Sequence, residues 1–160
     1  MIRTLKPNLQ RIAELSLLIL VAAFIATAAN AADAGRVKVV KGAVQIERDG
    51  KSATATVGTP VQVGDTIKTG ANGSVGITFQ DDSLLSVGPN SVLSVDRFVF
   101  DNTTHKGEFD TSLKRGTLTA VSGKLVKEQP ESMRVKTPAA IMGVRGTEFA
   151  VKVADRDSGK

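Results

Sequence analysis

The sequence predicts an all-β domain of short strands, preceded by one short apolar helix at the N-terminus. Apolar residues alternate with polar ones over most of the chain and do not recur every three or four positions, as they would in a long helix. The alternating runs end at short intervals in turn-forming pairs such as Asp49-Gly50 and Asn72-Gly73. Both observations favour strands joined by tight turns.

The first 31 residues have the pattern of a secretory signal peptide. Basic residues precede an apolar run at 15–26, and a small-x-small cleavage site follows at 29–31. The run is shorter than the roughly 20 residues that span a bilayer. We therefore expect residues 1–31 to direct the rest of the chain out of the cytoplasm, so that it is periplasmic or secreted. An uncleaved signal anchor is the alternative.

Composition predicts one domain and excludes several kinds of site. The 160 residues are 41% hydrophobic, which is enough for a single core. There is no cysteine, so disulfides and thiolate metal sites are excluded. Without residues 1–31 the chain keeps 18 of its 21 Lys+Arg and 15 of its 16 Asp+Glu, so the net charge falls from +5 to +3. The two signs are interspersed, which argues against a nucleic-acid partner.

The first half of the domain reads as strands separated by glycine turns. Residues 32–35 form a small-residue spacer, and 36–48 form a strand that bends at Gly42. Small and polar residues at 51–56 suit an edge strand. Further turns are expected at Gly64-Asp65 and, with the type I′ preference, at Asn72-Gly73.

A repeat of eight residues marks the most regular part of the chain. Two sets of apolar residues recur at this spacing: Ile77, Leu85 and Leu93, and Phe79, Val87 and Val95. The repeat fits either an antiparallel meander or roll, or the successive sides of a β-solenoid-like coil. Periodicity does not distinguish them, because both place the same side chains inward.

The second half predicts a hairpin, an exposed excursion and two more strands. The hairpin pairs 108–113 with 116–121, and the polar segment 122–132 is expected to lie in solvent. Strands at 133–137 and 148–153 follow, and 154–160 forms a charged tail. We expect several of the phenylalanines to share one core.

Between the last two strands lies a stretch with two glycines around one arginine. Its motif residues are Thr137, Pro138, Gly143, Arg145, Gly146 and Thr147. Arg145 could brace the loop by binding carbonyl groups or a carboxylate such as Asp65 or Asp81. The alternative is that it grips an anionic or peptide ligand.

The sequence offers no catalytic, metal-binding or cofactor-binding constellation. His105 is the single imidazole and lies in a polar loop, so we interpret it as a surface residue. Asp81 and Asp82 fit turns better than cation ligands. The remaining candidate is a surface, because an extended peptide can add to the exposed edge strands at 51–56 or 148–153.

Two groups of motif residues together resemble the FecR domain family. The late motif is one signature, and the other is a set of turn residues: Gly64, Asp65, Gly70, Gly73, Pro89 and Asn90. The resemblance covers about 36–153 and implies an all-β extracytoplasmic domain. In its best-known members, the domain belongs to an inner-membrane regulator that relays a signal from an outer-membrane siderophore receptor to a sigma factor.

One departure from those members shapes the functional expectation. Only about a dozen residues precede the apolar run, too few for the cytoplasmic anti-sigma segment. We therefore expect a stand-alone periplasmic FecR-like module that binds a protein or cell-envelope component without catalysis or a cofactor. Contact with the membrane is expected only through an uncleaved signal segment. The alternatives are an accessory role in iron-uptake signalling through a separate membrane regulator and, third, an enzyme.

Overall fold

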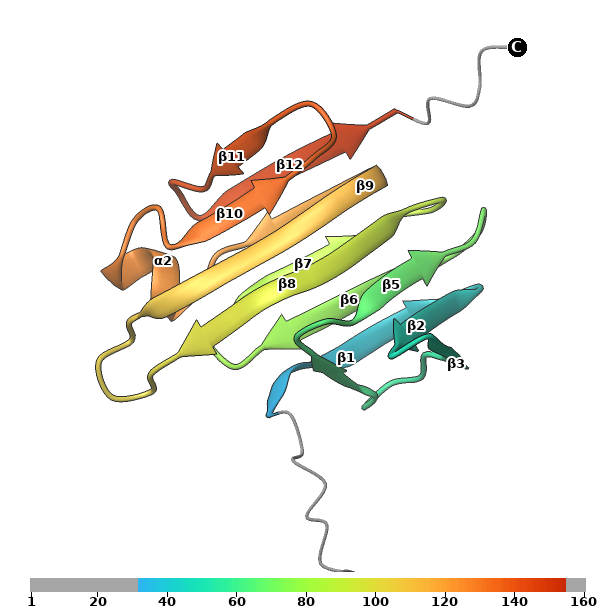
Figure 1. The fold of residues 1–160 in the computed structure, drawn as a ribbon, viewed down its shortest axis with the longest axis horizontal. Coiled ribbons are helices and arrows are strands. Elements are labelled where there is room, and N and C mark those ends of the chain that lie inside the picture. Colours follow the sequence, from blue (N-terminus) through green and yellow to red (C-terminus); the bar gives the residue numbers. More distant parts are fainter. Residues whose placement is uncertain (1–31, 155–160) are drawn as a thin grey trace, which may run out of the picture. The chain divides into compact units, whose positions relative to one another are not determined.

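The computed structural model describes residues 32–154, and these form an antiparallel β structure with one short helix (Figure 1). The expected signal peptide, and the expected charged tail after residue 154, lie outside the described residues. No helix within residues 32–154 is long and apolar enough to cross a membrane. The elements in chain order are β1 (Asp33–Lys41), β2 (Val44–Arg48), β3 (Lys51–Thr54), β4 (Pro60–Gln62), β5 (Thr66–Thr69), β6 (Ser74–Phe79), β7 (Leu84–Val87), β8 (Val92–Phe100), β9 (Gly107–Val121), α2 (Lys124–Glu128), β10 (Met133–Lys136), β11 (Ile141–Gly143) and β12 (Glu148–Val153).

The strands form one continuous sheet that folds over on itself into two layers. We define layer A as the strand order β4-β1-β6-β7-β9-β12, and layer B as the order β3-β2-β5-β8-β9-β10-β11. Figure 1 looks onto layer B, with β6 and β7 of layer A behind it. The ring of Phe79 in layer A lies 4.4 Å from that of Phe109 and 5.4 Å from that of Phe98, both in layer B. The inner faces of the layers therefore share one core.

Strand β9 belongs to both layers, because it changes layer at Gly116. Its first part pairs with β8 and β10, and its second part pairs with β7 and β12. Gly116 has φ +92°, and a Cβ there would lie 2.0 Å from Ser91 Oγ. Only glycine fits that bend without displacing Ser91. The predicted hairpin between 108–113 and 116–121 is therefore wrong: the glycine that suggested its turn marks the point where one long strand bends.

Three other segments cross between the layers beside this bend. They are 42–43, 70–73 and 88–91, which join β1 to β2, β5 to β6 and β7 to β8. Gly70 N donates to Ala43 O (2.9 Å), and Asn90 N donates to Gly70 O (3.0 Å), so the crossings hold one another. A turn does form at 70–73, where Gly73 N donates to Gly70 O (2.9 Å), but it links two layers and is not of type I′, because neither Asn72 nor Gly73 has a positive φ. Gly73 is required there because its Cβ would lie 2.2 Å from Ala43 O.

The eight-residue repeat arises from antiparallel pairing and not from a solenoid coil. Ile77 of β6 lies opposite Leu85 of β7, and Leu93 faces the same core from β8 in the other layer. All three side chains are at most 1% exposed. Every strand pair in residues 32–154 is antiparallel except β9 with β10. The all-β prediction is confirmed, and of its two arrangements the roll is the one observed.

Two further sequence expectations are corrected by the local structure. Strand β1 begins at Asp33, inside the segment expected to be a spacer. The excursion 122–132 contains α2, whose Leu125 is fully buried and whose Val126 is 5% exposed. A single helical turn is too short to show a 3.6-residue period, so only the burial of these two residues reveals it. The predicted edge strand at 51–56 is confirmed as β3, at one end of layer B.

Candidate functional site

The turn residues of the motif set lie at opposite ends of the strands and do not form one site. Gly70, Gly73 and Asn90 meet at the layer crossings, where Pro89 is exposed. Gly64 and Asp65 form the turn between β4 and β5. Both groups of turn residues lie in segments that connect the two layers.

Asp65 is a buried carboxylate held by an arginine. Arg48 Nε donates to Asp65 Oδ1 (2.6 Å), Arg48 Nη2 donates to Oδ2 (2.7 Å), and Gln62 N donates to Oδ2 (2.8 Å). The hydrogen bond to Asp65 raises the pKa of Arg48. Asp65 is fully buried, so this pair fixes the turn before β5. Asp65, one of the two carboxylates expected to bind Arg145, is therefore bound to Arg48.

Asp81, the other carboxylate proposed for Arg145, is also bound elsewhere. It accepts hydrogen bonds from Ser83 Oγ (2.6 Å) and Ser83 N (3.1 Å), and Ser83 Oγ accepts one from Gly123 N (2.9 Å). These contacts join the β6–β7 turn to the start of the α2 segment. Asp81 and Ser83 are both fully buried, which makes this a structural junction.

The late motif forms the turn before β11 and the crossing from β11 to β12, and this crossing lies beside α2. Thr137 and Ala140 close the turn before β11 through Thr137 N to Ala140 O (2.8 Å) and Ala140 N to Thr137 Oγ1 (3.1 Å), with Pro138 exposed between them. Gly143 pairs with Arg134 at the end of β11. Val144 is 5% exposed, and its N–H donates to Met133 O (2.9 Å).

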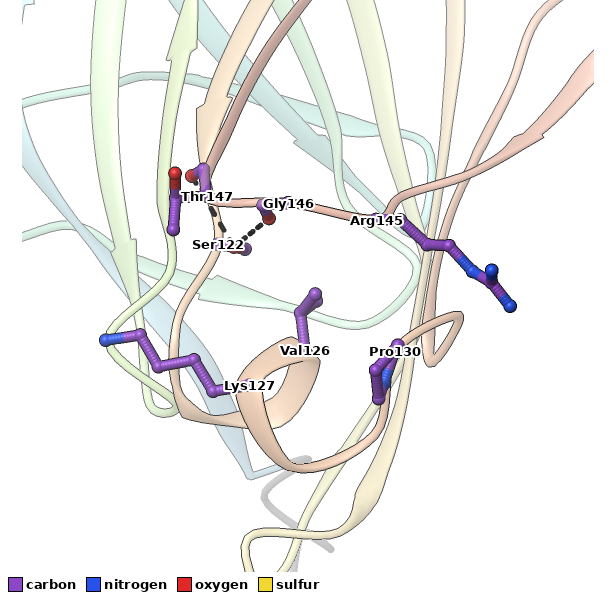
Figure 2. A pocket seen from close by; sticks show the side chains of 7 residues that line it. All are labelled: Ser122, Val126, Lys127, Pro130, Arg145, Gly146 and Thr147. Carbon is purple, nitrogen blue, oxygen red and sulfur yellow. Dashed lines mark hydrogen bonds between the residues drawn. The ribbon is translucent and has the colours of Figure 1, made fainter.

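Arg145 does not brace this crossing from within. Its side chain is 72% exposed and is paired with Glu131, itself exposed. Figure 2 shows the guanidinium directed away from Ser122. Ser122 supplies the bracing: its Oγ donates to Gly146 O (2.6 Å), and its N–H donates to Thr147 O (2.8 Å). Sequence reasoning missed Ser122 and Val144, because a lone serine and a lone valine carry no pattern.

A pocket of about 560 Å³ lies between α2 and this crossing. Val126 points from α2 toward the crossing, and Pro130 lies on the same side as α2 (Figure 2). The residues that line the pocket are Ser122, Val126, Lys127, Pro130, Arg145, Gly146 and Thr147. Val126 and Pro130 give the pocket an apolar floor, and Lys127 and Arg145 place two cations at its margin. This combination suits the binding of a ligand. Within residues 32–154 there is no cluster of three or more side chains able to hold a metal ion.

Strand β12 begins at the end of this crossing and forms the free edge of layer A. It pairs with β9 on one side, and among the described strands it has no partner on the other. Ser122 and Thr147 form a hydrogen-bonded pair, and such pairs alternate along an antiparallel ladder. The backbone groups that point to the free edge are therefore those of Glu148, Ala150 and Lys152.

His105 lies far along the chain from this edge, in the loop between β8 and β9. Its ring stacks on Phe100, with centroids 6.0 Å apart and planes within 8°. The backbone N–H of His105 donates to Asp101 O (2.7 Å). These contacts give the histidine a place in the loop structure.

Comparison with known proteins gives one family match and one structural match. A protein-family profile described as "FecR protein" matches residues 65–159. A solved structure titled "Cell surface anchoring domain" is similar at 29% sequence identity and a TM-score of 0.37, over 38% of this chain and 82% of that one. No curated protein matches the chain.

Proposed function

This chain belongs to the FecR protein family, and from that premise we propose that it is an exported, non-enzymatic binding module that recognises a protein or cell-envelope component through the free edge of β12. The family match and the all-β fold support an envelope-associated domain without catalysis. The observation that carries the proposal is the edge of β12. Its backbone groups at Glu148, Ala150 and Lys152 are directed away from β9, where an extended segment can pair with them.

The proposal includes export by residues 1–31, with 36–153 as the binding domain. N-terminal sequencing of the protein recovered from the periplasm or medium tests it. A first residue at or just after position 32 supports cleavage. A chain that is found in the membrane fraction and still begins at Met1 contradicts cleavage.

A proline at position 150 tests recognition at the β12 edge. The N–H of Ala150 points to the free edge, so Ala150→Pro removes a donor for an added strand and leaves the ladder to β9 intact. Ser52→Pro on β3 is the matched control. Ala55 N donates to Val44 O (2.9 Å), and the alternating register therefore turns the N–H of Ser52 to the free edge of layer B.

The readout is photo-crosslinking in cells, with a photoreactive residue at Ala154, which is exposed just beyond β12. Adducts with envelope components should be lost with Ala150→Pro and kept with Ser52→Pro. Adducts of equal intensity in both variants would contradict recognition at β12. Thermal melts of the two purified proteins establish that both are folded.

A further inference from the structure

The free edge of β12 carries two opposite charges that have no partner within the described residues. Glu148 and Lys152 are exposed, and residues 32–154 provide neither a salt bridge nor a side-chain hydrogen bond to them. Both lie on the outer face of layer A with Ala150 between them. Phe149, Val151 and Val153 alternate with them on the inner face and are only half-buried against the core.

Beside β12, layer B extends one strand farther than layer A. Beyond β9, layer B continues for two strands, β10 and β11, whereas layer A continues for β12 alone. In Figure 1, β11 accordingly lies beyond β12. The strip of layer A next to β12 thus faces β11, whose Met142 is half-buried. A single strand added there would cover Met142 and Phe149, whereas the edge of a second sheet would meet β11.

We propose that the occupant is a single extended segment of a partner, antiparallel to β12, with the pattern acidic, apolar, any residue, apolar, basic. Antiparallel pairing sets the outward backbone groups of Glu148, Ala150 and Lys152 directly opposite those of the segment, with two hydrogen bonds for each pair. The acidic residue lies opposite Lys152 and the basic residue opposite Glu148. The two apolar residues lie opposite Val151 and Phe149, on the inner face.

The charges select one register among those that the backbone allows. A shift of two residues either way keeps every side chain on its own face but removes both opposite-charge pairs. A shift of four in either direction sets like charges opposite each other, which opposes pairing. The inference rests on the proposed edge recognition and adds the sequence pattern that the partner presents.

The chain provides its own probe, because Glu148 to Lys152 reads acidic, apolar, small, apolar, basic. A fluorescent peptide that copies residues 147–153 (Thr-Glu-Phe-Ala-Val-Lys-Val) is titrated against the full chain. The comparison peptide exchanges the two charges (Thr-Lys-Phe-Ala-Val-Glu-Val). We expect the exchanged peptide to bind about tenfold more weakly, since two attractive cross-strand pairs become repulsive.

The charge-reversed protein Glu148→Lys/Lys152→Glu completes the experiment. It should prefer the exchanged peptide by a similar factor, a reversal that general loss of fold does not produce. N-methylation of the peptide's central alanine removes the donor opposite Ala150 and should abolish binding. Equal binding of both peptides to both proteins would overturn the charge pattern, and undiminished binding of the N-methylated peptide would overturn pairing at this edge.

The remaining outcomes separate this inference from the proposed function. If both peptides fail to bind, or bind without regard to charge, while Ala150→Pro still abolishes envelope adducts, the pattern is overturned and edge recognition stands. If Ala150→Pro leaves the adducts intact, edge recognition itself is overturned. Self-association of the full chain that the peptide disrupts, measured by sedimentation velocity, would assign the edge to a second copy and overturn the single-segment occupant.

Discussion

Replacing Gly116 with alanine is expected to destabilise the protein by about 3–7 kcal/mol, because β9 changes layer at this residue. A non-glycine residue at φ +92° costs roughly 1–3 kcal/mol. The new Cβ would lie 2.0 Å from Ser91 Oγ and 2.5 Å from Ser91 Cα, and displacing that backbone costs about 1–3 kcal/mol more. The hydrogen bond from Thr117 N to Ser91 Oγ (3.0 Å) is lost as well, at about 0.5–1.5 kcal/mol.

Gly58→Ala is the matched control for this substitution. Gly58 has the same φ of +92°, but nothing lies within 4 Å of the position that a Cβ would take. It should show only the backbone cost of roughly 1–3 kcal/mol. The difference between the two variants, about 2–4 kcal/mol, then measures the close approach of β9 to Ser91.

Urea unfolding of the full chain, followed by circular dichroism, provides the measurement. Folded domains have about 5–15 kcal/mol of stability, so the Gly116 variant should lose a large part of it and its midpoint should fall well below that of the Gly58 variant. Equal midpoints for the two would refute the reasoning. They would show that the bend in β9 tolerates a side chain and that the contact with Ser91 does not constrain the fold.

Three further predictions concern the core, the buried ion pair and the β8–β9 loop. Phe109→Ala should cost about 3–5 kcal/mol in urea unfolding, because its fully buried ring packs on Phe79 in the other layer and on Phe98 in its own. Phe100→Ala, at a half-buried position, should cost clearly less. Arg48→Met should lower the free energy of unfolding by about 3 kcal/mol, since it leaves the buried carboxylate of Asp65 without its cation. Adding Asp65→Asn should recover part of that loss. An unchanged urea midpoint for Arg48→Met would contradict the role of the pair. The backbone N–H groups of Thr103 and then Thr104 lower the pKa of Asp101, so its contribution to stability should be present above the ordinary aspartate pKa and disappear as the pH falls through the lowered value. An NMR titration of the carboxyl group measures this, and a midpoint at or above the ordinary value would refute it.

The sequence predicts the strands well where alternation decides which residues enter the core. Ile77, Phe79, Leu85 and Val87 are each at most 2% exposed, as their alternation requires. The sequence does not predict where one strand passes from one layer to the other. Gly116 after Lys114-Arg115 looks the same whether the chain turns back as a hairpin or bends and continues.

The candidate site was only partly predictable, and for a related reason. The late motif and the edge strand at 148–153 were both identified, because proline, glycine and alternation leave local signals. The contacts that hold the crossing come from Ser122 and Val144, whose importance depends on residues more than ten positions away. The arginine that the motif draws attention to is instead exposed, and the carboxylates proposed for it have other partners.

Because a single strand runs through both layers, neither layer can form a complete sheet without the other. The first part of β9 pairs with β8 and β10, and the second part pairs with β7 and β12. Separating either part of β9 from its neighbours therefore exposes the apolar faces of both layers. The domain should consequently melt as one cooperative unit, with central amides of β6 and of β8 exchanging their hydrogens at the same free energy. By the same logic, a cut in the exposed loop at 101–106 would yield two pieces that fold only when mixed.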